Sequence, residues 1–174
     1  EELHEPQKLL QTIKNNKLTR IFFTPSHLVN LLDFNDAAKY LTTIKHLEIS
    51  GEPIDNRVLT TIQQQLANTK IYNRYGATEI ASVIYSDLTN LKHTSGSMLP
   101  AGQPIQNTKA FIVDCNLKPL PIGCSGEIIL GGDSCATGYL GVDSNEAFFQ
   151  PPETSSTVNF FRTGDLGVLL ADGK

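Results

Sequence analysis

Residues 73–79, Asn-Arg-Tyr-Gly-Ala-Thr-Glu, follow a short β-branched and aromatic run at 70–72, and this stretch decides the expected fold. A strand that leads into a polar, glycine-containing segment is typical of the carboxyl edge of a parallel sheet, where ligands bind. The pattern predicts a strand at 70–74 and a loop at its carboxyl end that carries residues 73–79. A second polar motif, Arg-Thr-Gly-Asp at 162–165, lies near the end of the chain.

Helical and strand patterns alternate before the first motif. Apolar residues recur at helical spacing in some segments and cluster as short β-branched or aromatic runs in others. The expected helices are 5–16, one that begins after a Thr24 cap with Pro25 in its first turn, a short one capped by Asn35, and 56–68; the expected strands are 19–23, 45–50 and 70–74. This rhythm predicts a parallel sheet with right-handed crossovers.

The second half of the chain is punctuated by proline and glycine and contains no long amphipathic pattern. Short strands are expected at 109–114, 127–131, 159–162 and 167–171. Such strands predict a small antiparallel sheet or distorted barrel. We therefore predict an α/β fold with a partial parallel α/β subdomain at 1–88 and a β-rich, barrel-like subdomain at 89–174.

Composition excludes several classes of protein. The net charge is −4 and no long basic run occurs, so nucleic acid is not an expected partner. No apolar run approaches the length of a membrane helix, so no membrane association is expected. The three cysteines form no CxxC pair, which favours a reduced cytoplasm over a disulfide framework. Walker, GxGxxG, GxSxG and HExxH motifs are absent.

Together, the motifs at 73–79 and 162–165 resemble those of the adenylate-forming superfamily. This superfamily contains the amino-acid adenylation domains of nonribosomal peptide synthetases, acyl- and aryl-CoA ligases, and luciferases, which activate a carboxylate with ATP and release pyrophosphate. The resemblance runs from about Leu18 to Lys174, and the segments 104–108 and 112–114 lean toward the peptide-synthetase branch. It implies ATP and Mg²⁺ as cofactors, an amino acid or other carboxylate as substrate, and a carrier protein with a phosphopantetheine arm as partner.

The resemblance assigns the chemistry to two carboxylates and a hydroxyl. Glu79 is expected to hold Mg²⁺, which prefers one or two protein carboxylates plus phosphate oxygens. Thr78 is expected to donate to a phosphate oxygen and help fix the reacting geometry. Asp165 is expected to accept hydrogen bonds from both ribose hydroxyls. The alternative is turn chemistry alone, with Gly76 supplying backbone freedom and Gly-Asp forming an ordinary turn.

Further residues are assigned to the nucleotide by the same resemblance. The amide of Asn73 is expected to recognise the adenine edge, and the ring of Tyr75 to lie in the nucleotide pocket. The alternatives are an asparagine that caps a strand end and a tyrosine that fills the core. The full set of nucleotide-binding positions is Gly51, Glu52, Pro53, Asn73, Tyr75, Gly76 and Asp165.

Substrate-pocket positions also follow from the family register, and two of them are charged. The expected pocket residues are Phe22, Glu48, Ser50, Arg74, Ser82 and Val83. Because buried charges must be paired, Glu48 and Arg74 are expected either to pair with each other or to present one charge to a polar substrate.

One position departs from the family pattern. Residues 136–139 read Ala-Thr-Gly-Tyr, where the family usually has arginine at the position of Thr137. The change removes a permanently charged guanidinium, so it is open whether the parent protein is a standard, fully active member.

The chain also ends within a hairpin signal, Asp172-Gly173, which predicts that it is an internal fragment of a larger domain. The family's phosphate loop, catalytic lysine and amino-anchoring aspartate are expected outside it. We expect the fragment to be inactive alone and to self-associate through an unpaired strand edge. Two other interpretations remain: an acyl- or aryl-CoA ligase, and a nucleotide-binding module that has lost catalysis.

Overall fold

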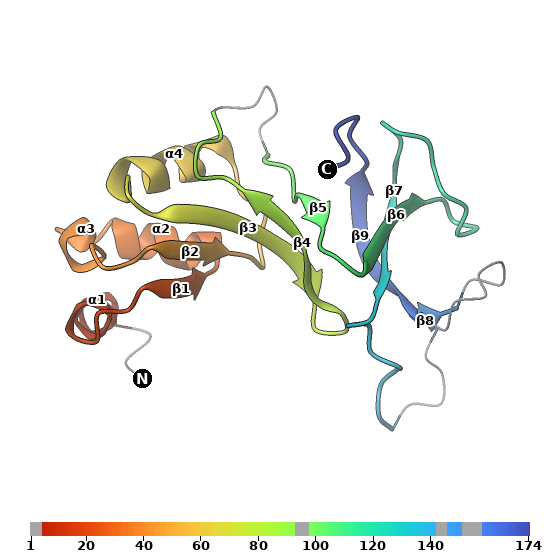
Figure 1. The fold of residues 1–174 in the computed structure, drawn as a ribbon, viewed down its shortest axis with the longest axis horizontal. Helices are drawn as coiled ribbons and strands as arrows, with labels where there is room; N and C mark the ends of the chain where they lie inside the picture. Colours follow the sequence, from red (N-terminus) through yellow and green to blue (C-terminus); the bar gives the residue numbers. More distant parts are fainter. Residues whose placement is uncertain (1–4, 93–97, 142–145, 151–157) are drawn as a thin grey trace. The chain divides into compact units, whose positions relative to one another are not determined.

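The computed structural model describes residues 5–92, 98–141, 146–150 and 158–174 (Figure 1). The chain groups into two compact units, one made of Glu1–Arg74 and Ser86–Ala101 and the other of Tyr75–Tyr85 and Gly102–Lys174. The chain therefore passes from the first unit to the second in the middle of the 73–79 motif. The subdomain division at 88/89 stays a prediction.

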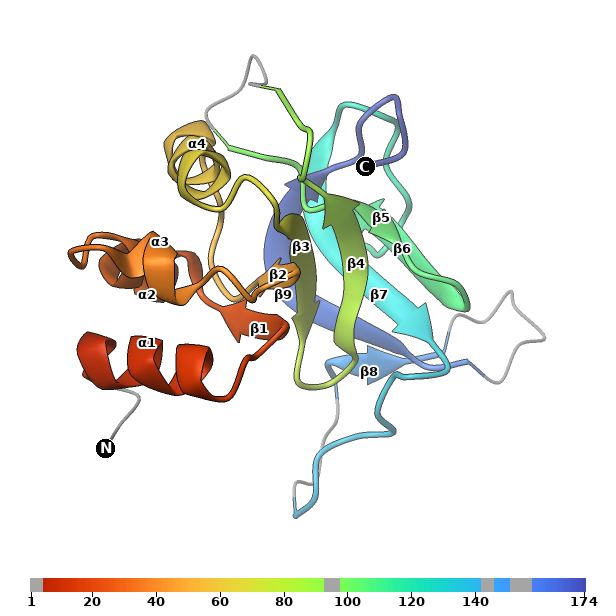
Figure 2. The ribbon, with the colours of Figure 1, turned by 60° about the vertical axis from the view of Figure 1, so that its left-hand side comes forward.

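The first unit contains a parallel sheet with helical crossovers, as the sequence predicts. Its elements are α1 (Pro6–Asn15), β1 (Arg20–Phe23), α2 (Pro25–Leu32), α3 (Ala37–Tyr40), β2 (His46–Ile49), α4 (Asn56–Gln65) and the start of β3 (Lys70–Ala77). Strand β2 pairs in parallel with β1 and with β3, so that Glu48 lies between Phe22 and Tyr72. The four helices gather on one side of these strands (Figure 2).

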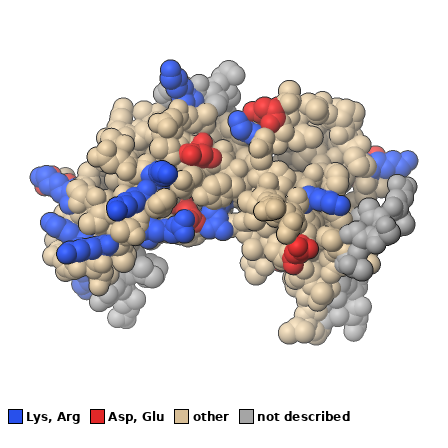
Figure 3. All heavy atoms as spheres, in the orientation of Figure 1, with Lys and Arg blue, Asp and Glu red and all other residues tan. Residues whose placement is uncertain are grey.

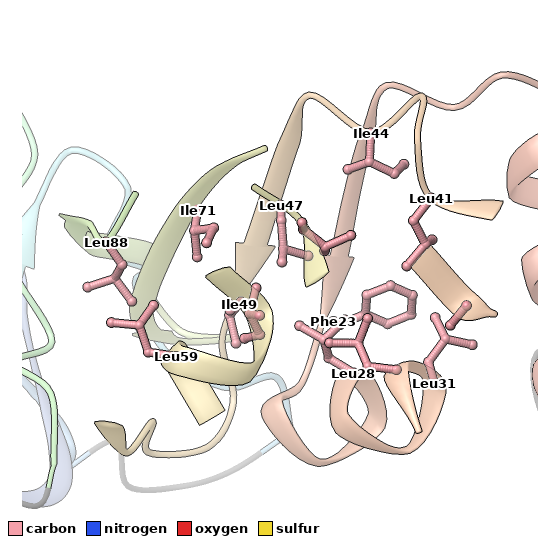
Figure 4. Close-up of a cluster of buried hydrophobic side chains, with 14 of the residues drawn as sticks. Phe23, Leu28, Leu31, Leu41, Ile44, Leu47, Ile49, Leu59, Ile71 and Leu88 are labelled. Carbon is pink, nitrogen blue, oxygen red and sulfur yellow. The ribbon is translucent and has the colours of Figure 1, made fainter. Parts of the chain in front are cut away.

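Strand alternation gives this sheet one apolar and one polar face. Phe23, Leu47, Ile49 and Ile71 are buried in the same cluster as the helix residues Leu28, Leu31 and Leu59 (Figure 4). The intervening strand positions form the opposite face, and they include Arg20, Phe22, Glu48, Tyr72 and Arg74. Burial of the apolar row fixes the register, because a slip of one residue would exchange the two faces.

Local capping explains where two of the helices begin. The Thr24 hydroxyl accepts a hydrogen bond from the His27 N–H at 3.4 Å, and Pro25 occupies the first turn of α2. Asp55 caps α4 by accepting from the Val58 N–H at 2.8 Å. The predicted Asn35 cap is wrong, because α3 begins after Asp36, whose backbone is left-handed with φ 63°. Asn35 and Asp36 are adjacent, and both residue types tolerate the left-handed conformation. The sequence alone therefore does not decide which of them precedes the helix.

The second unit is built from antiparallel strands. It contains the end of β3, most of β4 (Ala81–Asp87), and the remaining strands β5 (Gln103–Pro104), β6 (Thr108–Val113), β7 (Ser125–Gly132), β8 (Phe148–Phe149) and β9 (Phe160–Val168). The strand orders are β1-β2-β3-β4-β5 in one sheet and β6-β7-β9-β8 in the other. The predicted fold class, a parallel α/β layer followed by a β-rich part, is confirmed.

One strand prediction fails here. In place of separate strands at 159–162 and 167–171, the single strand β9 runs continuously from Phe160 to Val168 and ends there. A small core in this unit is formed by Phe160 with Val113 and Ile129. Gly131 lies against Phe160, since a Cβ at this glycine would fall 2.4 Å from the ring.

Candidate functional site

The 73–79 motif lies mainly in a strand and not in the predicted loop. Residues 73–77 belong to β3, and only Thr78 and Glu79 lie in the turn that leads into β4. The reason is Gly76, where a Cβ would fall 1.9 Å from the carbonyl oxygen of Ala81. The missing side chain lets β4 approach β3 closely, so β3 extends further than its residue types indicate. Fully buried Ile80 anchors the turn.

Tyr139 holds the side chain of Glu79. Its hydroxyl donates to Glu79 Oε1 at 2.6 Å. The same segment also binds the turn through the backbone, because the Ala136 N–H donates to the Glu79 carbonyl at 2.8 Å. Ser134 adds a hydrogen bond from its hydroxyl to the Ile80 carbonyl at 3.0 Å. The turn and its carboxylate are therefore fixed by a segment that follows more than 50 residues later in sequence.

The Arg-Thr-Gly-Asp motif forms a bulge in β9. Ile129 pairs with Arg162 and Glu127 with Leu166, so residues 163–165 lie opposite the single residue Ile128. The Thr163 hydroxyl donates to the Ile128 carbonyl at 2.8 Å and accepts from the Asp165 N–H at 3.1 Å. Bulges redirect side chains, and this one turns Asp165 out of the ladder.

Asp165 meets Tyr75 from the first motif. The Tyr75 hydroxyl donates to Asp165 Oδ2 at 2.7 Å. Burial is the main reason that the pKa of Tyr75 is raised well above its usual range, and the neighbouring Asp165 carboxylate adds to the rise. Tyr75 is thus a neutral donor at all physiological pH values. The two motifs, which the sequence separates widely, are joined by this hydrogen bond within the second unit.

Arg162 fixes the start of the bulge through Glu127. Its guanidinium donates to both carboxylate oxygens of Glu127, with Nη2 to Oε2 at 2.7 Å and Nε to each oxygen at 3.2 Å. The Gly164 N–H donates to the same carboxylate at 3.3 Å. These contacts, led by the hydrogen bond from Arg162, hold the pKa of Glu127 below its usual range.

A shallow hollow of about 480 Å³ lies beside these groups in the second unit. Two of its walls come from the motifs, with Glu79 on one side and Arg162 to Gly164 on another. The lining residues are Ala77, Glu79, Glu127, Tyr139, Glu146, Ala147, Phe161, Arg162, Thr163 and Gly164.

In the first unit, Glu48 pairs with Arg74 and with a second arginine. Arg74 Nη1 donates to Glu48 Oε2, and Arg20 Nε lies 3.1 Å from Glu48 Oε1. The Glu48 side chain is 9% exposed, whereas Arg74 is 33% and Arg20 66% exposed. Of the two alternatives left open by the sequence, mutual pairing is therefore present. Figure 3 shows both acidic and basic side chains on the surface of the first unit.

The other predicted pocket positions differ in exposure. Phe22 is 53% exposed on the polar face of the sheet, whereas Ser50 is buried just beyond β2. On β4 in the second unit, Val83 is buried and Ser82 is half-buried. Their role as a substrate pocket stays a prediction.

The Gly51-Glu52-Pro53 segment is tied to the N-terminus of α2. The Glu52 carboxylate accepts from the Ser26 hydroxyl at 2.7 Å and from the Ser26 N–H at 3.0 Å. These hydrogen bonds hold the pKa of Glu52 below its usual range. Gly51 adopts φ +91°, a left-handed conformation that glycine tolerates best. The structure thus shows an anchoring role for Glu52, while nucleotide contact by this segment stays a prediction.

Asn73 is buried, and its amide is engaged within the first unit. Its Nδ2 donates to the Pro100 carbonyl at 3.3 Å. Recognition of adenine by this amide stays a prediction.

Several residues of the site were not assigned a role from the sequence, among them Arg20 and Tyr139. Arg20 contacts Glu48 across neighbouring strands, and Tyr139 contacts Glu79 across 60 positions. No local spacing signals either contact. Knowledge of the β1–β2 register would have found Arg20, since it lies on the same face as Glu48.

The donor set fits a nucleotide-bound magnesium ion. Among the described residues there is no group of three or more histidine, cysteine, aspartate or glutamate side chains that could enclose a metal. Mg²⁺ does not need such a group, because it binds one or two carboxylates together with phosphates and water. Glu79 offers one such carboxylate, with Oε1 held by Tyr139 at 2.6 Å and Oε2 outside that hydrogen bond.

Comparison with known proteins identifies the class. A family model described as "AMP-binding enzyme" matches residues 1–140, so the chain belongs to the AMP-binding enzyme family. The match covers more than half of the chain and includes the whole of the 73–79 motif.

The sequence relatives include two bacterial synthases and nonribosomal peptide synthetase asaC of Aspergillus flavus, which is 31% identical over 179 residues, 97% of this chain and 17% of that protein. Tyrocidine synthase 3 of Brevibacillus parabrevis is 32% identical over 172 residues, which is 98% of this chain and 3% of that protein. Bacitracin synthase 3 of Bacillus licheniformis is 30% identical over 170 residues, which is 97% of this chain and 3% of the relative. The chain thus spans a small part of the length of these relatives.

Solved structures agree on the fold. CmiS6 has a TM-score of 0.89 at 26% identity, with 99% of this chain and 42% of that chain covered. IdnL1 has a TM-score of 0.87 at 26% identity, with 98% and 36% covered. An artificially fused adenylation–PCP di-domain from Klebsiella oxytoca, NpsA-ThdA, shares the fold with a TM-score of 0.81 at 21% identity, with 98% and 32% covered. Among the residues described, no helix has the length and apolar character needed to cross a membrane.

Proposed function

We propose that this chain contributes the nucleotide site and part of the substrate site to an enzyme that activates an amino-acid carboxylate as aminoacyl-AMP. The proposal depends on one observation: two motif carboxylates lie where the strands are interrupted. Glu79 is in the β3–β4 turn, and Asp165 is on the β9 bulge. Both are partly or fully exposed, and each is oriented by a tyrosine hydroxyl. A relative whose name is nonribosomal peptide synthetase supports an amino acid as the substrate.

In the proposed reaction an oxygen of the substrate carboxylate forms a bond to the α-phosphorus of ATP. The α–β phosphoanhydride bond breaks, and pyrophosphate leaves with the bonding electrons. Asp165 accepts hydrogen bonds from the ribose hydroxyls, and Thr78 donates to a phosphate oxygen. Glu79 would hold Mg²⁺, which when bound would neutralise phosphate charge. The nucleotide is also contacted by Tyr75, Asn73 and the segment 51–53.

The acyl group then passes to a carrier protein. The thiol of a phosphopantetheine arm attacks the acyl carbon of the adenylate, and AMP leaves. The di-domain from Klebsiella oxytoca, in which an adenylation domain is joined to a PCP, supports a carrier protein as partner.

The charged positions bear on the substrate pocket. Glu48 is balanced by Arg74, and Arg20 adds a further positive charge on the same face of the sheet. Phe22 is the register partner of Glu48 and supplies an exposed apolar ring beside the ion pair. We propose that these residues, with Ser50, Ser82 and Val83, line the pocket for the substrate side chain.

We also propose that the 174 residues alone do not catalyse adenylation. Two solved structures with the same fold are covered to only 36% and 42% of their length, which supports a complete site that draws on more chain than this. Electrostatic stabilisation of a pentavalent phosphorus requires all of its donors to be held in place beforehand.

The test is amino-acid-dependent ATP–pyrophosphate exchange by the full-length protein that contains this chain. Glu79→Gln should lower exchange by about 100-fold or more, because a neutral amide binds Mg²⁺ poorly and electrostatic groups of this kind contribute factors of that order. Glu5→Gln is the matched control, since Glu5 is exposed beside α1 and its carboxylate forms an exposed ion pair with Lys8 at 3.0 Å. Exchange by Glu79→Gln equal to wild type would show that the metal role of Glu79 is wrong.

A further inference from the structure

Tyr139 gives Glu79 a hydrogen bond without giving it a positive charge. Glu127, another carboxylate that lines the hollow, differs from Glu79 in this respect. Its charge is neutralised by Arg162, whose Nη2 lies 2.7 Å from Glu127 Oε2. Among the described residues no lysine or arginine forms an ion pair with Glu79, whose partner is the phenol of Tyr139. A neutral donor orients a carboxylate and leaves its negative charge available to a cation, whereas a guanidinium would compete with that cation.

We propose that Tyr139 is a positioning residue for Glu79. Its hydroxyl holds Oε1 so that Oε2 and the full negative charge are presented to the Mg²⁺ of a bound nucleotide. The inference rests on the proposed function and extends it to a residue outside both motifs. Partners of metal-binding carboxylates act in this way in other proteins, and their loss commonly weakens metal binding by about 10–100-fold.

Aromatic packing keeps the Tyr139 ring in place. Phe148 on β8 contacts the ring edge-to-face, with centroids 5.2 Å apart, and Phe148 in turn packs on Phe161 of β9 at 5.2 Å. Such pairs restrict ring orientation. The phenol is therefore aimed at Glu79 by the sheet that also carries the bulge.

The hydroxyl of Tyr139 can be removed without removing the hydrogen bonds that attach residues 134–136 to the β3–β4 turn. The Ala136 N–H and the Ser134 hydroxyl bind the backbone of the turn at 2.8 and 3.0 Å, and neither contact involves the Tyr139 side chain. Removing only the phenol oxygen therefore leaves the turn attached and the ring packed. A loss that depends on Mg²⁺ concentration then reports on orientation of the Glu79 carboxylate.

The experiment compares Tyr139→Phe with Tyr40→Phe in the full-length protein. Tyr40 is the matched control, because its ring on α3 lies under the Lys14 ammonium group, 5.0 Å away, and the substitution removes the same single atom. The Mg²⁺ concentration for half-maximal pyrophosphate exchange is measured first. Tyr139→Phe should raise it by about 10-fold or more, with smaller loss at saturating Mg²⁺, while Tyr40→Phe matches wild type.

A second readout does not depend on turnover. Binding of Mn²⁺ in the presence of a non-hydrolysable ATP analogue is followed by electron paramagnetic resonance, and Tyr139→Phe should weaken it by a similar factor. In a Glu79→Gln background, the added Tyr139→Phe change should have no further effect on either quantity. Thermal midpoints of Tyr139→Phe and Tyr40→Phe should be alike.

The outcomes separate this inference from the proposed function. Unchanged Mg²⁺ dependence and Mn²⁺ binding in Tyr139→Phe, with an active wild type, would overturn the positioning role alone. A loss equal at all Mg²⁺ concentrations, accompanied by a lower thermal midpoint, would also overturn it, because it would show a structural role only. A wild-type protein that binds Mn²⁺–nucleotide but exchanges no pyrophosphate with any amino acid would instead contradict the proposed function.

Discussion

The hydroxyl of Tyr75 and the carboxylate of Asp165 are 90 positions apart in sequence and 2.7 Å apart in space. One belongs to β3 and the other to the bulge of β9, so the hydrogen bond joins the two motifs on which the family resemblance depends. Burial raises the pKa of Tyr75 well above its usual range, so the phenol stays protonated and donates at physiological pH. Asp165 is left with a fixed orientation and an exposed side chain.

Asp165→Asn should weaken ATP binding more than it slows the chemical step. The proposed contact is to the ribose, which does not react, so its loss removes binding that is equal in the ground state and transition state. Loss of a charged hydrogen bond of about 1.5–3 kcal/mol corresponds to a rise of roughly 10–100-fold in KM for ATP. Steady-state exchange kinetics of the full-length protein measure this change. A fall in kcat with an unchanged KM would contradict the ribose assignment.

Glu48→Gln should destabilise the protein by roughly 2 kcal/mol, because it leaves the partly buried Arg74 guanidinium without its charged partner. Chemical denaturation measures the free energy of unfolding. Asp36→Asn is the control, because Asp36 forms an exposed ion pair with Lys39 and exposed pairs contribute about 0–1 kcal/mol. Equal effects of the two substitutions would show that Glu48 is not the centre of a buried ion cluster.

Stability should fall as pH drops below about 4.5, the ordinary pKa of a glutamate. Glu127 has a lowered pKa in the folded protein because of Arg162, so the unfolded chain takes up its proton first. Its contribution is fully present above the unfolded pKa and is lost as pH falls through the folded pKa. Glu127→Gln should therefore flatten the dependence of the unfolding free energy on pH below 4.5. An unchanged slope in that variant would contradict the assignment.

Gly76→Ala should disrupt the β3–β4 hairpin. The added Cβ would lie 1.9 Å from the Ala81 carbonyl oxygen, which is backbone and cannot rotate away. We expect a loss of several kcal/mol of stability, at the upper end of single substitutions. Gly123→Ala is an informative control for space, since nothing lies within 4 Å of the position that its Cβ would occupy, although its φ of +85° adds strain. Thermal unfolding that ranks Gly123→Ala as the more damaging change would refute the close-approach argument.

The isolated 174-residue chain should self-associate. Strand β1 ends the order of its sheet, and Phe22 on that strand is 53% exposed. An unpaired edge beside an exposed aromatic ring favours pairing with another copy. Sedimentation velocity across a concentration series should show a rising average mass. A single monomeric species at high concentration would count against this expectation.

The sequence predicts the local elements well, because helix periodicity and caps are encoded within a few residues. The spacing of Leu9, Leu10 and Ile13 indicates α1, and Thr24 marks the start of α2 before any tertiary contact is known. The extent of β3 could not be predicted in the same way. It depends on the approach of β4 to Gly76, which is a property of the folded hairpin.

The residues of the candidate site also fall into a group that the sequence predicts and a group that it does not. Motif residues Glu79 and Asp165 stand out in the sequence because their neighbours form recognisable patterns. Their partners do not, since Tyr139 reaches Glu79 across 60 positions and Arg20 reaches Glu48 only through strand register. Pairing between distant segments is decided by how the strands assemble, and single-sequence patterns do not contain that information.

The bulge in β9 has a consequence for the tolerance of this sheet to changes in chain length. Three residues, 163–165, occupy the space of one, so the strand contains two residues more than its ladder with β7 requires. Two is an even number, and side chains alternate with a period of two, so Leu166 to Val168 keep the face that they would have in an unbroken strand. Removal of two residues from this motif would erase Asp165 or its orientation and leave the sheet in phase, whereas removal of one would turn the rest of β9 inside out. A protein built this way could lose the proposed nucleotide contact of Asp165 in one genetic step while its architecture persists.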